Sequence, residues 1–189
     1  MEELSATAKA ILGIVAMRPR TGYEIKAFVD SSTRFFWAAS YGQIYPELKR
    51  LAENGLIEGT DEPTGGRRRT VYKITAAGKK RLREWHREPS ANLEFRDEGM
   101  LKLFLAGAIE PASAPRIARD RAEQARGTAA RLREIESHAE GKDPSSYAVL
   151  TSGIAFHDFM AELFEKAARD LERGERTRKA GAGAPGRRN

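Results

Sequence analysis

The order of short segments in the first half of the chain restricts the fold more than any other feature of the sequence. Apolar residues recur at helical spacing before Pro19, after Thr21 and after Ser40, so we expect three short helices. Thr21 and Ser40 suit the first position of a helix, and Gly55 suits its end because glycine readily adopts the left-handed conformation. Two β-prone segments around Gly65-Gly66 then predict a hairpin.

Three helices, a hairpin and a fourth helix opened by Thr75 follow the layout of a winged helix-turn-helix. After Pro89 the composition changes. Residues 95–109 form a strongly apolar segment, and residues 116–140 place small apolar residues at steps of four and three. The last apolar segment has a similar seam, so the two long helices are expected to form an antiparallel hairpin that packs against a partner.

We therefore expect a mainly α protein in three parts. These are a winged helix-turn-helix DNA-binding domain over 1–88, a helical dimerisation domain over 89–173 and a disordered basic tail over 174–189. The net charge of +6 is unevenly distributed, because the first and last parts are basic and the middle part is slightly acidic. Basicity favours an anionic partner such as nucleic acid, although ordinary solubility also accounts for a charge of this size.

Composition also excludes several classes of protein. The absence of cysteine excludes disulfides, thiol catalysis and cysteine-based zinc sites. No apolar run approaches the roughly 18 residues that a transmembrane helix needs, and the N-terminus lacks the basic-then-apolar order of a signal peptide. We expect a cytoplasmic protein with no membrane partner.

The third predicted helix divides into a buried and an exposed face. Ile44, Leu48 and Leu51 lie within about 40° of one another on a helical wheel, so this face points into the core. The opposite face is polar and partly basic, with Lys49 further along the helix. A helix of this kind is suited to the major groove of DNA.

The start of this helix holds the candidate DNA contacts. The amide of Gln43 can pair with a base edge, and the hydroxyls of Ser40 and Tyr41 suit phosphate oxygens. Gly42 adds no bulk, so the backbone can approach the duplex closely. Tyr45 suits either a DNA contact or a packing role.

Three adjacent arginines, Arg67, Arg68 and Arg69, follow the turn of the predicted hairpin. Such a run often belongs to a solvated loop. Its place on the wing of a helix-turn-helix favours contact with phosphates or a minor groove.

Other residues that bear chemistry have simpler interpretations. Phe35, Phe36 and Trp37 suit packing that anchors the turn or the wall of an effector pocket, and Trp85 suits core packing or a pocket wall. Phe156, Phe159 and Phe164 suit a dimer seam or a ligand site with His157. The three histidines are far apart in sequence, so their spacing predicts no metal site. No nucleophile or phosphate-binding loop accompanies the carboxylates near Asp97, so we expect neither an enzyme nor a cofactor.

The sequence resembles the PadR family of bacterial transcriptional regulators over nearly its whole length. The resemblance is carried by Ile11-Leu-Gly-Ile-Val, Thr21-Gly-Tyr-Glu-Ile, Phe36-Trp, Ser40-Tyr-Gly-Gln-Ile-Tyr-Pro-Glu-Leu-Lys-Arg-Leu, Gly55-Leu-Ile-Glu, Val71-Tyr-Lys-Ile-Thr and Gly78. It implies a homodimer on a pseudo-palindromic double-stranded DNA operator, usually as a repressor, with a C-terminal helical domain that dimerises.

The resemblance also implies roles for individual residues. Ser40, Tyr41, Gly42, Gln43 and Tyr45 match the recognition helix, Tyr23 matches a phosphate contact, and Arg67 to Arg69 match the wing. Some family members respond to phenolic or other aromatic small molecules. The sequence therefore predicts a homodimeric repressor of neighbouring genes that a small aromatic effector releases. The alternative is a small-molecule sensor or partner-binding module that keeps the fold without strong DNA binding.

Overall fold

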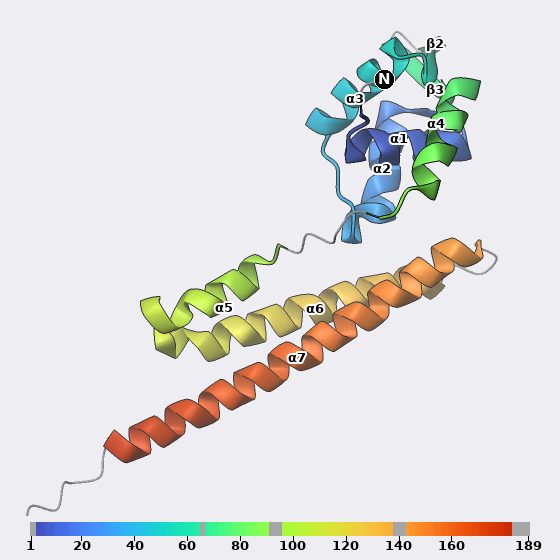
Figure 1. The fold of residues 1–189 in the computed structure, drawn as a ribbon. Coiled ribbons are helices and arrows are strands. Elements are labelled where there is room, and N and C mark those ends of the chain that lie inside the picture. Colours follow the sequence, from blue (N-terminus) through green and yellow to red (C-terminus); the bar gives the residue numbers. More distant parts are fainter. Residues whose placement is uncertain (1–2, 65–66, 91–95, 138–142, 183–189) are drawn as a thin grey trace, which may run out of the picture. The chain divides into compact units, whose positions relative to one another are not determined.

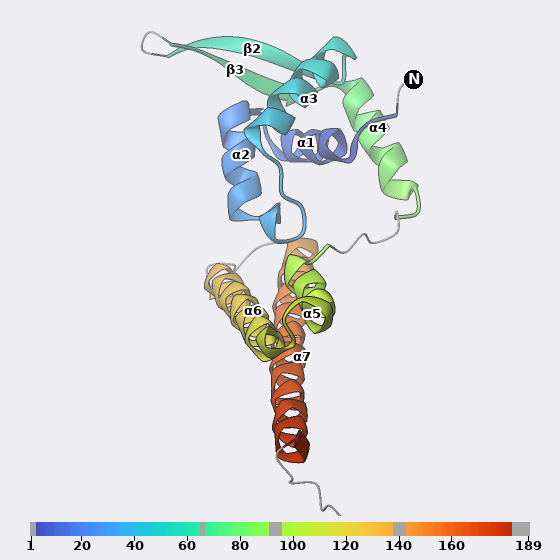
Figure 2. The ribbon, with the colours of Figure 1, turned by 90° about the vertical axis from the view of Figure 1, so that its left-hand side faces the viewer.

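The computed structural model describes residues 3–64, 67–90, 96–137 and 143–182, with side chains left undescribed at 63–64, 67–68 and beyond Gly174. The chain divides into two compact units, Met1–Asn92 and Leu93–Asn189. The first holds several short helices with a small sheet, and the second holds a long helical hairpin with one further helix (Figures 1 and 2). This arrangement confirms the predicted mainly α fold, with an N-terminal winged helix-turn-helix and antiparallel C-terminal helices.

The first unit follows the predicted order of elements and adds one short strand. Its elements are α1 (Ala6–Met17), β1 (Arg20–Thr21), α2 (Gly22–Ser31), η1 (Thr33–Phe35), α3 (Tyr41–Glu53), β2 (Ile57–Thr64), β3 (Arg67–Ile74) and α4 (Ala76–Arg87). β2 and β3 form the predicted hairpin, and β1 pairs with the other edge of β3 in an antiparallel sheet of order β1-β3-β2. A strand of two residues is too short to give an alternating pattern, so the sequence does not predict β1.

Side chains at the helix ends confirm the predicted caps. Thr21, Ser40 and Thr75 precede α2, α3 and α4 as N-cap residues. The Thr75 hydroxyl also donates to the carbonyl oxygen of Gly55 over 2.7 Å, which ties the start of α4 to the end of α3. Gly55 has a φ of 66°, the left-handed conformation expected after a helix.

The apolar face of α3 is fully buried, as predicted. Ile44, Leu48 and Leu51 are each 0% exposed and pack with the buried residues of α1. Ser5, the N-cap of α1, donates its hydroxyl to Glu47 Oε1 over 2.6 Å. This bond turns the Glu47 carboxylate inward and keeps a negative charge off the outer face of α3.

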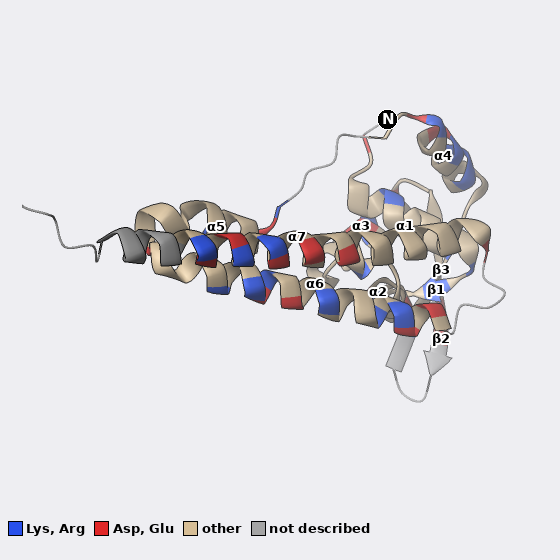
Figure 3. Ribbon diagram, turned by 90° about the horizontal axis from the view of Figure 1, so that it is seen from below, with Lys and Arg blue, Asp and Glu red and all other residues tan. Residues whose placement is uncertain are grey.

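The second unit consists of α5 (Glu98–Ile109), η2 (Pro111–Ser113), α6 (Ala114–Ser137) and α7 (Pro144–Ala182). The predicted alanine seam of α6 is buried: Ala118, Ala122, Ala125 and Ala129 are each 0% exposed. Alanine lets two helices approach closely. Lys and Arg alternate with Asp and Glu along both long helices (Figure 3).

Ion pairs fix the register of the hairpin. From one end to the other, Arg133 pairs with Asp158, Arg126 with Glu165 and Arg119 with Glu172. The α7 partner moves forward in sequence as the α6 residue moves back, so the two helices run antiparallel. They lie side by side in both views of the ribbon (Figures 1 and 2).

One expectation needs correction. α7 continues to Ala182, so the stretch Gly174–Ala182, expected to be disordered, is helical, and residues 183–189 lie outside the described part. Glutamate, arginine, lysine and alanine dominate this stretch, and their helix propensity outweighs the two glycines.

None of the helices in the described parts of the chain is long and apolar enough to cross a membrane.

Gly78 sits where α4 approaches the start of β2 most closely. A Cβ at this position would overlap the carbonyl oxygen of Leu56 and lie 2.8 Å from Ile74 Cγ1. We expect Gly78→Ala to lower the free energy of unfolding by about 1–3 kcal/mol, because neither neighbour can move freely. Thermal unfolding followed by circular dichroism measures this.

The matched control is Gly13→Ala in the same unit. Gly13 lies inside α1, and its nearest neighbour would be Leu82 Cδ1 of α4 at 4.0 Å, an ordinary van der Waals contact. This change should raise stability by about 0.5–1 kcal/mol, the helix preference of alanine over glycine. Equal effects of the two substitutions would contradict a tight packing role for Gly78.

Candidate nucleic-acid interface

A capping box fixes the start of α2. Glu24 Oε2 accepts from the backbone N–H of Thr21 over 2.7 Å and from its hydroxyl over 2.9 Å, and the Glu24 N–H donates to Thr21 Oγ1 over 3.2 Å. The backbone and hydroxyl donors of Thr21 hold the pKa of the Glu24 carboxyl below its usual value. The box holds Tyr23 on the outside of α2, where its side chain is 68% exposed.

The start of α3 uses Gln43 as part of its cap. Gln43 Oε1 accepts from the Ser40 N–H over 2.9 Å and from the Ser40 hydroxyl over 3.1 Å. The oxygen of the amide is therefore occupied, while its Nε2 is left to donate elsewhere. Ser40, Gly42 and Gln43 are all exposed, and Gly42 has open space on its side-chain face.

Two tyrosines of α3 form an exposed aromatic surface. The rings of Tyr41 and Tyr45 stack with centroids 6.2 Å apart and planes inclined by 20°. Lys26 of α2 places its Nζ 5.5 Å from the centre of the Tyr41 ring and also pairs with Asp30. Lys26 is a candidate contact that the sequence reading missed, although it lies one helical turn from Tyr23 on the same side of α2.

Tyr45 combines a packing contact with an exposed side chain. A Cβ at Gly22 would lie 2.7 Å from the Tyr45 ring, so this ring packs directly on the start of α2. Its side chain is nevertheless half exposed. Burial, and then the charges of Tyr45 and Asp61, raise the pKa of the phenol of Tyr72 on β3.

Part of the charge on the wing is paired. Arg69 donates to Glu62 Oε2 from Nη2 over 2.7 Å, and Thr70 donates to Asp61 over 2.8 Å across the hairpin. Glu62 and Arg69 are directly opposite each other in the register. Glu62 therefore offsets part of the positive charge of Arg69 before any DNA is bound. Arg67 and Arg68 lie on β3 opposite Thr64 and Pro63, and their side chains lie outside the described ones.

The remaining predicted contact, Lys49, is exposed on the outer side of α3. Its Nζ lies 3.8 Å from Glu53 Oε1, a weak surface pair. The structure thus brings Tyr23, Ser40, Tyr41, Gly42, Gln43 and Tyr45 to the exposed starts of α2 and α3. Among the described residues no group of three or more histidine or acidic side chains could hold a metal ion.

A helix-turn-helix that exposes the polar start of its second helix and is followed by a two-stranded wing defines the winged-helix class of DNA-binding regulators. The sequence profile of the Transcriptional regulator PadR-like family matches residues 11–84, and that of the Virulence activator alpha C-term domain matches residues 95–172. Over residues 11–84 the chain belongs to the PadR-like family, whose members are transcriptional regulators and not enzymes.

Relatives with known structures share this fold. The negative transcriptional regulator PadR of Bacillus subtilis is 31% identical over 113 residues, which cover 59% of this chain and 62% of that protein, less than two thirds of its length. The crystal structure of Bacillus subtilis PadR in complex with operator DNA superposes with a TM-score of 0.78 at 25% identity, covering 88% of this chain and 99% of that one. Its complex with p-coumaric acid superposes with a TM-score of 0.72 at 24% identity, covering 89% and 99%.

The capping box of α2 predicts a pH-dependent stability. The folded-state pKa of Glu24 lies below its unfolded value, so the box stabilises the fold above about pH 4.3 and loses its effect as the pH falls through the lowered pKa. Glu24→Gln should therefore be less stable than the parent at pH 7, and the difference should shrink as the pH falls below about 4. Urea unfolding over a series of pH values measures it.

The control for this series is Glu58→Gln, at an exposed position of β2, which should change stability little at any pH. If the Glu24→Gln difference stayed constant down to acid pH, the carboxylate would not be acting as a charged cap.

Proposed function

We propose that this protein is a cytoplasmic, homodimeric and sequence-specific DNA-binding regulator, and that it represses neighbouring genes. The start of α3 carries the proposal. Ile44 and Leu48 are fully buried, while Ser40, Gly42 and Gln43 are exposed beside the Tyr41 and Tyr45 rings. In this class of protein the exposed start of the second helix enters the major groove.

The surroundings of this helix suit a DNA backbone. The hydroxyl of the exposed Tyr23 on α2 can contact a phosphate, and Lys26, whose side chain is 17% exposed and paired with Asp30, adds a positive charge nearby. Arg67 and Arg68 lie towards the tip of the hairpin, where cations can follow the backbone or enter a minor groove. The operator complex of Bacillus subtilis PadR supports this arrangement.

Two uncovered apolar stripes support a homodimer. Leu101, Phe104, Leu105 and Ile109 lie on one side of α5, and Phe104 and Ile109 are 83% and 77% exposed. On α7, Val149, Phe156, Phe159 and Leu163 recur at steps of seven, three and four, and all are exposed. Such a stripe is typical of a helix that packs against another helix. Phe164 is buried against α6 and belongs to the inside of one chain.

The p-coumaric acid complex of Bacillus subtilis PadR supports an aromatic effector that releases this protein from DNA. The alternative function is a small-molecule sensor or partner-binding module without strong DNA binding. The exposed apolar stripes of the second unit suit that alternative equally, so DNA binding must decide between the two functions.

Substitutions at Gln43 test the function and the role of this residue together. Binding is measured to duplex DNA from upstream of the protein's own gene and to a scrambled duplex of equal length. Gln43→Glu keeps an oxygen for the α3 cap and loses the Nε2 donor, so stability should persist while the preference for the specific duplex falls by about tenfold or more. Gln43→Ala should lose the preference and also about 0.5–1 kcal/mol of stability.

Gln124→Glu on the exposed side of α6 is the control for the added charge and should leave the preference unchanged. If the unchanged protein binds both duplexes equally, with and without candidate effectors, the sensor function is favoured. If Gln43→Glu weakens binding to both duplexes by the same factor, Gln43 contacts the DNA backbone and does not read a base.

Association through the apolar stripes is tested by Phe104→Glu. A charge in the centre of an apolar interface should weaken association by about 3 kcal/mol, roughly a hundredfold in Kd. Sedimentation velocity should then report one chain where the parent protein reports two. Met17→Glu, on an apolar residue of the first unit that is 64% exposed, should remain dimeric. A parent protein that sediments as a single chain would remove the homodimer from the proposal.

A further inference from the structure

Arg20 is a buried arginine whose charge Glu24 offsets only in part. It lies on β1, its side chain is only 7% exposed, and its guanidinium carbon lies 4.4 Å from the centre of the Phe28 ring. Its Nε is buried and has no hydrogen-bond partner among the described residues. Arginine at this depth is rare unless it is paired, because an unpaired buried charge is costly.

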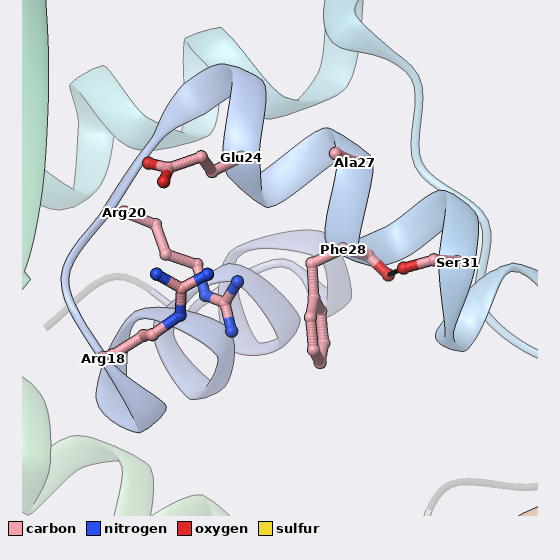
Figure 4. Close-up of a pocket in the computed structure, with 6 residues that line it drawn as sticks. All are labelled: Arg18, Arg20, Glu24, Ala27, Phe28 and Ser31. Carbon is pink, nitrogen blue, oxygen red and sulfur yellow. Dashed lines mark hydrogen bonds between the residues drawn. The ribbon is translucent and has the colours of Figure 1, made fainter. Parts of the chain in front are cut away.

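A second arginine increases this cost. The guanidinium groups of Arg18 and Arg20 lie side by side next to the Phe28 ring (Figure 4). Burial, and then the charge of Arg18, lower the pKa of Arg20, and Glu24 offsets this only in part. Glu24 Oε2 is occupied by the donors of Thr21, as described above. One carboxylate thus stands against two guanidiniums, and the site keeps a net positive charge.

The two guanidiniums border a pocket of about 280 Å³ on one side of α2. Its lining consists of Arg18, Arg20, Glu24, Ala27, Phe28 and Ser31. The volume lies near the lower end of the range for ligand sites, about 300–1,000 Å³, so it suits a small molecule. The lining offers positive charge at one end and apolar surface from Ala27 and Phe28 at the other.

We propose that this pocket binds a small organic carboxylate, with its carboxylate on the guanidiniums of Arg18 and Arg20 and its apolar part against Phe28. The planar fork of a guanidinium matches a carboxylate with two parallel hydrogen bonds. The bound anion supplies the counter-charge that Arg20 lacks and accepts hydrogen bonds from the guanidiniums. Inorganic phosphate shares the charge but has nothing to place against Phe28, so it binds more weakly.

The pocket also has a route to the DNA-binding surface, a link that rests on the proposed function. Glu24, Ala27, Phe28 and Ser31 lie on one side of α2, and the adjoining side carries Tyr23 and Lys26. A ligand that shifts α2 therefore moves these candidate phosphate contacts. Ligand binding itself does not depend on this link.

The test is a calorimetric titration of the full-length chain with benzoate, without DNA. We expect one saturable site per chain, with phosphate as a weaker competitor. Arg18→Gln should weaken benzoate binding by about tenfold or more, since one charge-assisted pair is lost. Arg18 is exposed, so the variant should fold normally. Arg83→Gln, the same change at an exposed position of α4, should bind benzoate like the parent protein.

Two results would overturn the proposal. One is the absence of saturable benzoate binding to the parent protein. The other is unchanged benzoate binding by Arg18→Gln. If that variant also lost about one unit of salt-dependence slope on duplex DNA, the arginine would be assigned to a DNA phosphate. Because the titration contains no DNA, its result does not depend on whether the proposed regulator function is correct.

Discussion

The burial of one face of α3 determines what the rest of the first unit can do. Ile44, Leu48 and Leu51 are fully buried, and each such side chain contributes about 1.5–3 kcal/mol. Rotating α3 to present another face would cost several kcal/mol, whereas a single hydrogen bond to a base gains only about 1 kcal/mol. The surface that meets DNA is therefore set by the core. The hydrogen bond from Ser5 to Glu47 also shapes this surface, because it turns the acidic side chain near the middle of α3 inward.

Under the proposed function Gln43 both caps α3 and reads a base, and this sharing restricts which base it can recognise. Its Oε1 accepts two bonds from Ser40, so the side chain is already ordered before DNA arrives. An ordered side chain loses less conformational entropy on binding. It can donate only through Nε2, and so suits acceptors such as guanine O6 or N7 and thymine O4. Pairing with adenine through both amide atoms would require the cap to open.

Local signals in the sequence predicted the elements well, and contacts between elements account for what was missed. The apolar spacing around Ile44 and the cap at Thr21 depend on neighbours within one or two turns, so periodicity and residue type reveal them. The packing of Tyr45 on Gly22 joins two helices. The pairing of Arg69 with Glu62 needs the register of the hairpin. Those contacts decide how much of a predicted contact residue is available to DNA, and spacing alone does not contain them.

The second unit buries a row of small side chains on α6 and leaves several large apolar side chains exposed. Alanines at the α6–α7 contact let the helices approach closely, and ion pairs along the edges, such as Arg126 with Glu165 at 2.6 Å, fix one register. Arg121 then pairs with the buried Asp97 at the start of α5 and lies 5.5 Å from the Phe164 ring, which orients α5 on the hairpin. Met160 and Phe164 of α7 pack with these alanines in the interior, while Phe104 of α5 and Phe159 of α7 remain exposed. A surface of this size and character is best covered by another apolar surface, and a second copy of the chain offers a matching one.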